Sequence, residues 1–188
     1  FLMLDPRTRL LIKGVAKICG RNPRGARPFP DIAVIAIAQA WGGHKHWWKR
    51  ATALAIFIGF VSLLRRAGLL AIRSNGLTWI VGRREISNPS KPPRVHSGVL
   101  LLVPFRKTRQ VQHSWVAVKG DHVTRLLARH VRWLNSLKQC PSFLFPARRK
   151  VGKNSWRPNQ SIMSTQTLIR LIRQALVEVC GMPIYKAS

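Results

Sequence analysis

Residues 51–81 read ATALAIFIGFVSLLRRAGLLAIRSNGLTWIV, and this stretch decides the fold because its pattern changes from helix to strand. Residues 51–64 are almost entirely apolar and end at two arginines, a pattern typical of a buried helix followed by a charged corner. Residues 69–73 predict a further helical turn or two, which Ser74-Asn75-Gly76 ends. Residues 77–81 then favour a short strand. A helical layer joined to a sheet is the expected result.

The flanking sequence extends this pattern in both directions. Before the stretch, Asp31 is a candidate cap or first-turn acid for a helix over 32–41, and the long apolar helix is expected to begin near Trp47. After it, residues 99–105 and 115–118 predict two partner strands joined by a long basic turn. We therefore expect a small antiparallel sheet in the middle of the chain.

The last third of the chain returns to helical spacing. Apolar residues recur every three or four positions from Asp121, which predicts a helix there. A basic loop is expected to follow from residue 146 to Ser161, and a final amphipathic helix to run from about Thr165 to Cys180, with Gly181 as its stop. The predicted fold class is mainly α with a small antiparallel β-sheet, that is, α+β.

The charge of the chain points to an anionic partner. Among 188 residues, 33 are Lys or Arg and 5 are Asp or Glu, which gives a net charge of +28. A charge excess of this size repels itself unless an anion lies against it, and nucleic acid is the commonest such partner. The carboxylates are also far apart in sequence, which argues against a paired-carboxylate hydrolase or an acidic two-metal site.

Several classes of site are not indicated by the sequence. There is no phosphate-binding loop of the GxxxxGK[ST] type, no GxGxxG after a strand and no HExxH. The cysteines, Cys19, Cys140 and Cys180, lack metal-binding spacing and favour reduced thiols, so we expect an intracellular protein of the nucleus or cytoplasm, not a secreted one. The apolar run at 51–64 is shorter than the about 20 residues that span a bilayer, and favours a core helix.

The corner after the apolar helix resembles a known active-site box. The segment from Leu64 to Arg73 follows a long apolar helix and precedes a strand, and it resembles the first box of the tyrosine recombinases, the phage-integrase-like enzymes. In that family the helix ends in Leu-Arg-x-x-Glu-Leu-x-x-Leu. The resemblance places Arg65 at the family's first catalytic arginine. Gly68 stands where the family usually has an acid, which is a departure from the pattern.

A second box lies between the two later strands. The family carries a catalytic lysine on a β-hairpin, often as Lys-Thr, and here the turn reads Phe105-Arg106-Lys107-Thr108-Arg109. The resemblance therefore assigns the catalytic lysine to Lys107. It covers residues 29–188 as a partial catalytic domain, while residues 1–28 look like the end of a DNA-clamping region and its linker.

The chemistry of strand cleavage suits these residue types. The family cleaves and rejoins DNA through a 3′-phosphotyrosyl intermediate, which the resemblance implies here without metal or cofactor. An arginine stabilises the charge that develops on the phosphate oxygens, because its guanidinium is planar and permanently charged. A lysine can protonate the leaving 5′ oxygen. Nucleic-acid contacts are expected from further basic residues: Arg66, Arg106, Arg109, Arg148, Arg149, Lys150, Lys153 and Arg157.

Two elements of the family are not matched in this sequence. The family places a His-x-x-Arg box and then the nucleophilic tyrosine after the last helix seen here, so we expect the chain to be a fragment that cannot complete the reaction. His122-Val-Thr-Arg125 matches the box literally but stands directly after the hairpin, in the wrong order, and we expect it to be unrelated. Tyr185 stands upstream of the expected nucleophile and favours a packing role.

Three interpretations remain open at this point. The first is a tyrosine-recombinase-like protein that binds duplex DNA, with a homo-oligomer on DNA left open. The second is a non-catalytic basic RNA-binding or ribosome-associated protein. The third is a membrane-surface protein that uses the 51–64 run and its flanking cations. The tryptophans are expected to lie in the core or half-buried and not to stack on bases, and His44 and His46 to lie in a turn.

Overall fold

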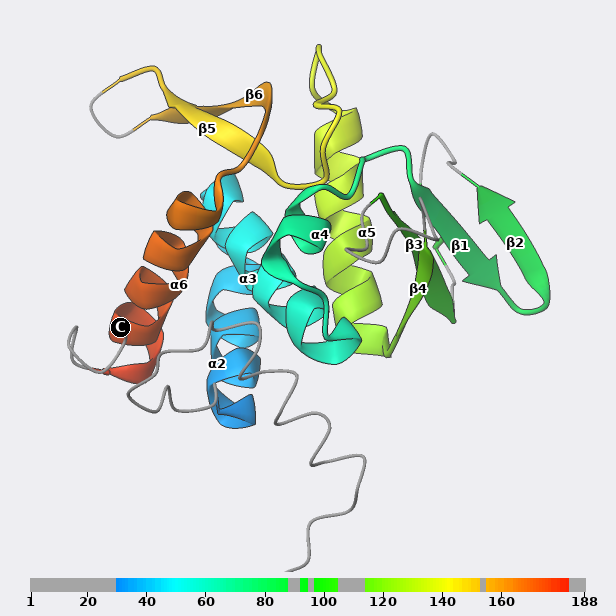
Figure 1. Ribbon diagram of the computed structural model, residues 1–188, viewed down its shortest axis with the longest axis horizontal. Coiled ribbons are helices and arrows are strands. Elements are labelled where there is room, and N and C mark those ends of the chain that lie inside the picture. The colour runs from blue at the N-terminus through cyan, green and yellow to red at the C-terminus, as the bar shows by residue number, and fades with distance from the viewer. Residues whose placement is uncertain (1–29, 88–91, 95–96, 105–113, 153–154, 183–188) are drawn as a thin grey trace, which may run out of the picture.

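The computed structural model describes residues 30–87, 92–94, 97–104, 114–152 and 155–182, and it has an α+β fold (Figure 1). The helices are α2 (Asp31–Gly42), α3 (Trp47–Ser62), α4 (Arg66–Leu70), α5 (Asp121–Asn135) and α6 (Thr165–Cys180). The strands are β1 (Leu77–Val81), β2 (Arg84–Ser87), β3 (Gly98–Val103), β4 (Ser114–Lys119), β5 (Pro146–Lys150) and β6 (Trp156–Ile162). The prediction of an α+β protein with a small antiparallel sheet is confirmed.

Helix α3 forms the centre of the helical layer. Its apolar run has side chains such as Leu54 and Ile58 buried, because α2, α5 and α6 all pack against it or against each other. A helix that is apolar on every side is stable in water only when its neighbours cover it in this way. Within the described ranges, no helix has both the length and the apolar character needed to cross a bilayer.

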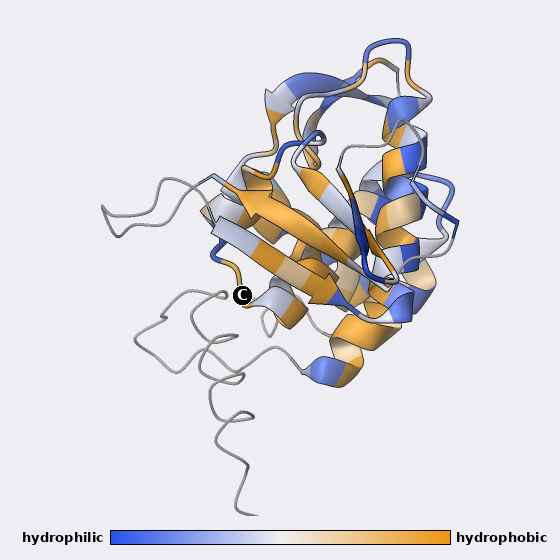
Figure 2. Cartoon of the chain, turned by 90° about the vertical axis from the view of Figure 1, so that its right-hand side faces the viewer, coloured by the Kyte–Doolittle hydropathy of each residue, from blue (hydrophilic) through white to orange (hydrophobic). Residues whose placement is uncertain are grey.

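The four-stranded sheet is antiparallel, with the strand order β2-β1-β3-β4. Its inner face carries Trp79, Val99 and Leu101, which are fully buried where α3 and α5 cover β3 and β4. Figure 2 shows the apolar residues running through the middle of this sheet. The outer face is more open, and Trp115 on β4 is 54% exposed there. The expectation of a buried or half-buried tryptophan is therefore wrong for Trp115.

Two strand regions differ from the sequence-based prediction. Strand β2 follows a tight turn at Gly82, whose φ of 60° suits glycine, and all its residues are exposed. The basic loop expected up to Ser161 is instead a hairpin of β5 and β6. Both were missed for the same reason, because these strands are polar or basic and lack a buried apolar face. Pro158 lies in β6, which pairs with β5 alone and so tolerates a residue that lacks an N–H donor.

The helix boundaries follow the predicted ones closely. Helix α4 begins at Arg66, a few residues before the predicted turn at 69–73. Helix α6 ends at Cys180, and Gly181 has a φ of 63°, the left-handed conformation expected of a helix-stop glycine. At its start, the Ser164 side chain accepts a hydrogen bond from the backbone N–H of Thr167. The proposed linker at 1–28 lies outside the described residues.

Candidate nucleic-acid interface

Arg65 lies at the sharp corner between α3 and α4. Leu63, two residues earlier, has a φ of 52° and is the one described non-glycine residue in the left-handed region. Leu64 is buried at the corner, and Arg65 is the N-cap of α4, with its carbonyl oxygen accepting a hydrogen bond of 2.9 Å from Leu69. The Arg65 side chain is exposed and pairs with no acid among the described residues. Arg66 follows as a half-buried first residue of α4.

The segment that carries Lys107 joins the paired ends of β3 and β4. Arg106, Lys107 and Arg109 themselves lie outside the described residues, so the expected approach of Lys107 to Arg65 stays a prediction. The strands on either side confirm the predicted hairpin context, because Val103 pairs with Ser114 at the last position of the β3–β4 ladder. The turn therefore leaves the sheet at the end where β3 stops.

The chain that follows α4 enters the sheet at this same end. Strand β1 begins at Leu77, which pairs with Leu101 near the end of β3. One residue earlier, the Gly76 carbonyl oxygen accepts a hydrogen bond of 2.8 Å from the backbone N–H of Leu102. A side chain at Gly76 would meet the Leu102 Cβ at 3.3 Å, so glycine permits this close approach. The connection from the Arg65 corner thus enters the sheet at the end where β3 stops and β4 begins.

The β5–β6 hairpin gathers the other predicted cations that the structure describes. Arg149 on β5 and Arg157 on β6 are direct cross-strand partners, and both are exposed. Lys150 is exposed opposite Trp156. Arg148 lies on the other face of β5 from Arg149, since successive side chains of a strand alternate. Lys153 lies outside the described residues.

Arg148 packs between two tryptophans and is half-buried. Its guanidinium carbon lies 4.8 Å from the ring centroid of Trp48 on α3 and 4.4 Å from that of Trp156 on β6. Its buried Nε has no hydrogen-bond partner among the described residues. Burial lowers the pKa of Arg148, and the nearby charge of Arg170 lowers it further. Arg148 therefore acts in this structure as an anchor of the hairpin.

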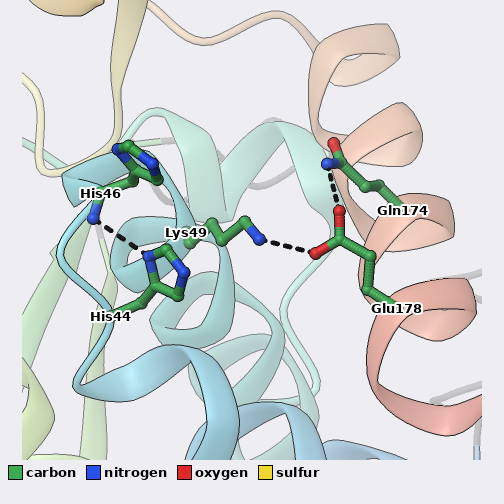
Figure 3. A network of polar contacts seen from close by, with 5 residues as sticks. All are labelled: His44, His46, Lys49, Gln174 and Glu178. Carbon is green, nitrogen blue, oxygen red and sulfur yellow. Dashed lines mark hydrogen bonds and ion pairs between the residues drawn. The ribbon is translucent and has the colours of Figure 1, made fainter. Parts of the chain in front are cut away.

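The segment His44 to Arg50 forms the surface on which the hairpin rests. The rings of His44 and His46 stack with centroids 5.1 Å apart, and His46 stacks in turn on Trp48 at 6.0 Å. The His44 Nδ1 accepts a hydrogen bond of 3.1 Å from the backbone N–H of His46 (Figure 3). Burial, together with the charge of Lys49, lowers the pKa of His44. No trio of potential metal ligands comes together among the described residues.

An ion pair connects this segment to the last helix. The Lys49 Nζ lies 2.6 Å from the Glu178 Oε2, and Gln174 donates a 2.6 Å hydrogen bond to the other carboxylate oxygen (Figure 3). Lys49 also lies 4.8 Å from the ring centroid of Trp41. These contacts give Lys49 a structural position, and they occupy one of the chain's few acids.

The literal His-x-x-Arg match lies in the first half of α5. His122 contacts Phe57, with ring centroids 5.7 Å apart, and Arg125 pairs with Asp121 at 2.5 Å. Both residues are exposed on α5, and the expectation that this match is unrelated to the family's box stays a prediction. Tyr185 lies outside the described residues.

His130 was not singled out from the sequence, and it is the most perturbed titratable group among the described residues. It is fully buried, and its Nε2 lies 2.8 Å from the Leu144 carbonyl oxygen, which requires a proton on Nε2. Its Nδ1 has no hydrogen-bond partner within the part of the chain that the structure describes. Burial is the main reason that its pKa falls to about 4, with the charge of Arg50 acting in the same direction. The apolar spacing of α5 gave no signal that set this histidine apart.

The basic surface has little internal compensation. If each of the 5 acids neutralised one cation, 28 of the 33 lysines and arginines would still have no acidic partner. Of the four described acids, Asp121 and Glu178 are already paired, with Arg125 and Lys49. No protein-family model matches the chain, and a comparison with curated proteins finds no relative.

Proposed function

We propose that this chain is a DNA-binding protein of the tyrosine-recombinase kind, in which Arg65 and Lys107 act on one backbone phosphate. The observation that carries the proposal is topological. The chain that leaves the Arg65 corner enters the sheet beside the end of β3, the strand that precedes Lys107 in the sequence. This topology supports the proposal that the two cations, far apart in sequence, act on one phosphate.

The local structure at Arg65 fits a phosphate-binding role. The left-handed Leu63 and the buried Leu64 fix the direction of the corner, while the guanidinium is exposed and pairs with no described acid. A planar guanidinium can donate two hydrogen bonds to one phosphate and stabilise the charge that develops during strand cleavage. Lys107 would supply the proton for the leaving 5′ oxygen.

The proposal covers phosphate binding by these two residues and not the whole reaction. The family's nucleophilic tyrosine and His-x-x-Arg box are not matched in the family's order in this sequence, and the position of the family's acid is Gly68, buried in α4. The step to be tested here is therefore the binding of the phosphate by Arg65 and Lys107. The net charge of +28 supports duplex binding through the backbone, with little dependence on base sequence.

The test is the salt dependence of duplex binding, measured by fluorescence anisotropy for the wild type and two variants. Arg65→Ala should weaken binding about tenfold and lower the slope of log K against log salt by about 0.9, the value for one phosphate contact. Arg83→Ala removes an exposed arginine from the turn between β1 and β2 and serves as the control, with both quantities unchanged. Duplex RNA should compete poorly. If the wild type binds RNA more tightly than duplex DNA and Arg65→Ala does not change the affinity, the RNA-binding alternative is favoured instead.

A further inference from the structure

The β5–β6 hairpin places two like charges directly opposite each other. Arg149 and Arg157 are register partners in the antiparallel ladder, so their side chains project from the same face. Both are exposed, and no acid is present anywhere in the sequence of β5 or β6. Like charges directly opposite destabilise an antiparallel pair. An anion bound between the two guanidinium groups would remove this repulsion.

The opposite face of the hairpin is firmly attached to the helical layer. Arg148 lies between Trp48 and Trp156, and Trp47 donates a hydrogen bond of 3.0 Å to the Trp156 carbonyl oxygen. At its base, the backbone N–H of Met163 donates to the Phe145 carbonyl oxygen at 3.1 Å. The two arginines are therefore presented on a fixed support, so little ordering is needed when a ligand binds.

We infer that Arg149 and Arg157 form a clamp for a single phosphodiester group of duplex DNA, separate from the phosphate held at Arg65. Guanidinium groups bind phosphate in a planar, bidentate manner, and two of them on neighbouring strands can approach one phosphate from both sides. The clamp positions the duplex on the protein and carries no base specificity. This inference rests on the proposed function, because it names a second contact to the same duplex.

The clamp divides the predicted cations of the hairpin into two roles. Arg149 and Arg157 contact the phosphate. Arg148, on the buried face, is a positioning residue that acts through the hairpin's attachment. Lys150 is exposed and lies opposite Trp156, on the same face of the hairpin as Arg148. It is therefore not part of the clamp.

The clamp is tested by a double-mutant cycle on duplex binding with Arg149→Ala, Arg157→Ala and the double variant. Because both side chains hold one phosphate, each single change should weaken binding about tenfold, and the double change should weaken it much less than a hundredfold. The salt slope of the double variant should fall by about 0.9, as for one phosphate and not two. The matched control is the Arg83→Ala/Arg84→Ala double variant, which removes two exposed arginines from the β1–β2 hairpin on the far side of the molecule (Figure 1).

A charge-conserving variant separates geometry from charge. Arg149→Lys/Arg157→Lys should keep the salt slope and lose severalfold in affinity, since lysine cannot donate bidentately. Additive losses with a slope change near 1.8, or a double variant that binds like the wild type, would overturn the shared clamp. If the wild type fails to bind duplex DNA at all, the proposed function itself fails; if it binds and only the hairpin variants are silent, this inference alone fails.

Discussion

The indole Nε1 of Trp47 donates a hydrogen bond of 3.0 Å to the backbone carbonyl oxygen of Trp156, two residues that lie 109 positions apart in the sequence. The contact joins the first residue of α3 to the first residue of β6. Trp47 also stacks on Trp133 of α5, with ring centroids 5.2 Å apart. One tryptophan thus connects the long helix, the α5 helix and the basic hairpin, which fixes where the hairpin's cations point.

The anchoring role of Arg148 predicts a loss of stability when it is removed. Arg148→Ala should lower the free energy of unfolding by about 1–2 kcal/mol, because it deletes a guanidinium packed against two indole rings. Urea unfolding measures this change. Lys150→Ala removes the same charge from an exposed position next to it and should change the free energy of unfolding by less than about 0.5 kcal/mol. Equal free energies of unfolding for the two variants would contradict the anchoring role of Arg148.

The hairpin shows where sequence reasoning stops. The basic segment after Pro146 gives no strand signal, because its strands owe their positions to tertiary contacts with Trp47 and Trp48 and not to alternating apolar residues. The segment HKHWWKR, residues 44–50, contains the signal that was available: cations and aromatic rings interleaved at the start of a buried helix. Its partner rings on distant strands could not be identified without the fold.

The helix-to-sheet region was more predictable. The apolar run of α3 and the short run of β1 carry strong periodic patterns, and both appear where the sequence placed them. The Arg65 corner follows from the end of that run. The left-handed Leu63 could not be foreseen, because leucine, unlike glycine, disfavours this conformation.

The join between β4 and α5 depends on a glycine backbone. Gly120 has a φ of 112° and a ψ of 128°, a region that side chains disfavour strongly. Gly120→Ala should therefore lower the free energy of unfolding by about 1–3 kcal/mol, although its Cβ would meet only Val123 at 3.7 Å. Gly152→Ala, where no positive φ is involved, is the control and should leave the unfolding midpoint near that of the wild type. Equal losses in both variants would contradict the role assigned to the Gly120 backbone, because replacing a glycine that has an ordinary backbone conformation is not expected to destabilise the protein.

The Lys49–Glu178 pair should matter more than an ordinary surface pair. The Lys49 side chain is only 14% exposed, so Glu178→Gln leaves a largely buried charge without its acid. We expect a loss of about 1–2 kcal/mol in the free energy of unfolding, reduced by solvent screening because Glu178 is 37% exposed. Asp121→Asn removes the acid of the exposed pair with Arg125 and should cost less than about 0.5 kcal/mol.

The same pair has a defined dependence on pH. Burial alone would raise the pKa of Glu178, but the hydrogen bonds from Lys49 and Gln174 lower it below its ordinary value. A carboxyl group whose pKa is lowered by folding stabilises the protein above its unfolded pKa, and this contribution is lost as the pH falls through the folded value. The stability difference between the wild type and Glu178→Gln should therefore shrink in acid. A difference that is constant down to acid pH would show that the carboxylate charge is not responsible.

His130 predicts a second pH effect, at a higher pH. Its pKa is about 4 in the folded protein and near 6.5 when unfolded, so between these values the unfolded chain binds the extra proton. The contribution of the neutral His130 to the free energy of unfolding is therefore fully present above about pH 6.5. It is lost as the pH falls toward 4, by up to about 3 kcal/mol. His130→Gln is the informative variant, because its amide can still donate to the Leu144 carbonyl oxygen but cannot titrate. Urea unfolding at pH 7, 6, 5 and 4 should show the wild type losing stability faster than His130→Gln. Parallel curves for the two proteins would mean that the buried imidazole does not govern the acid response.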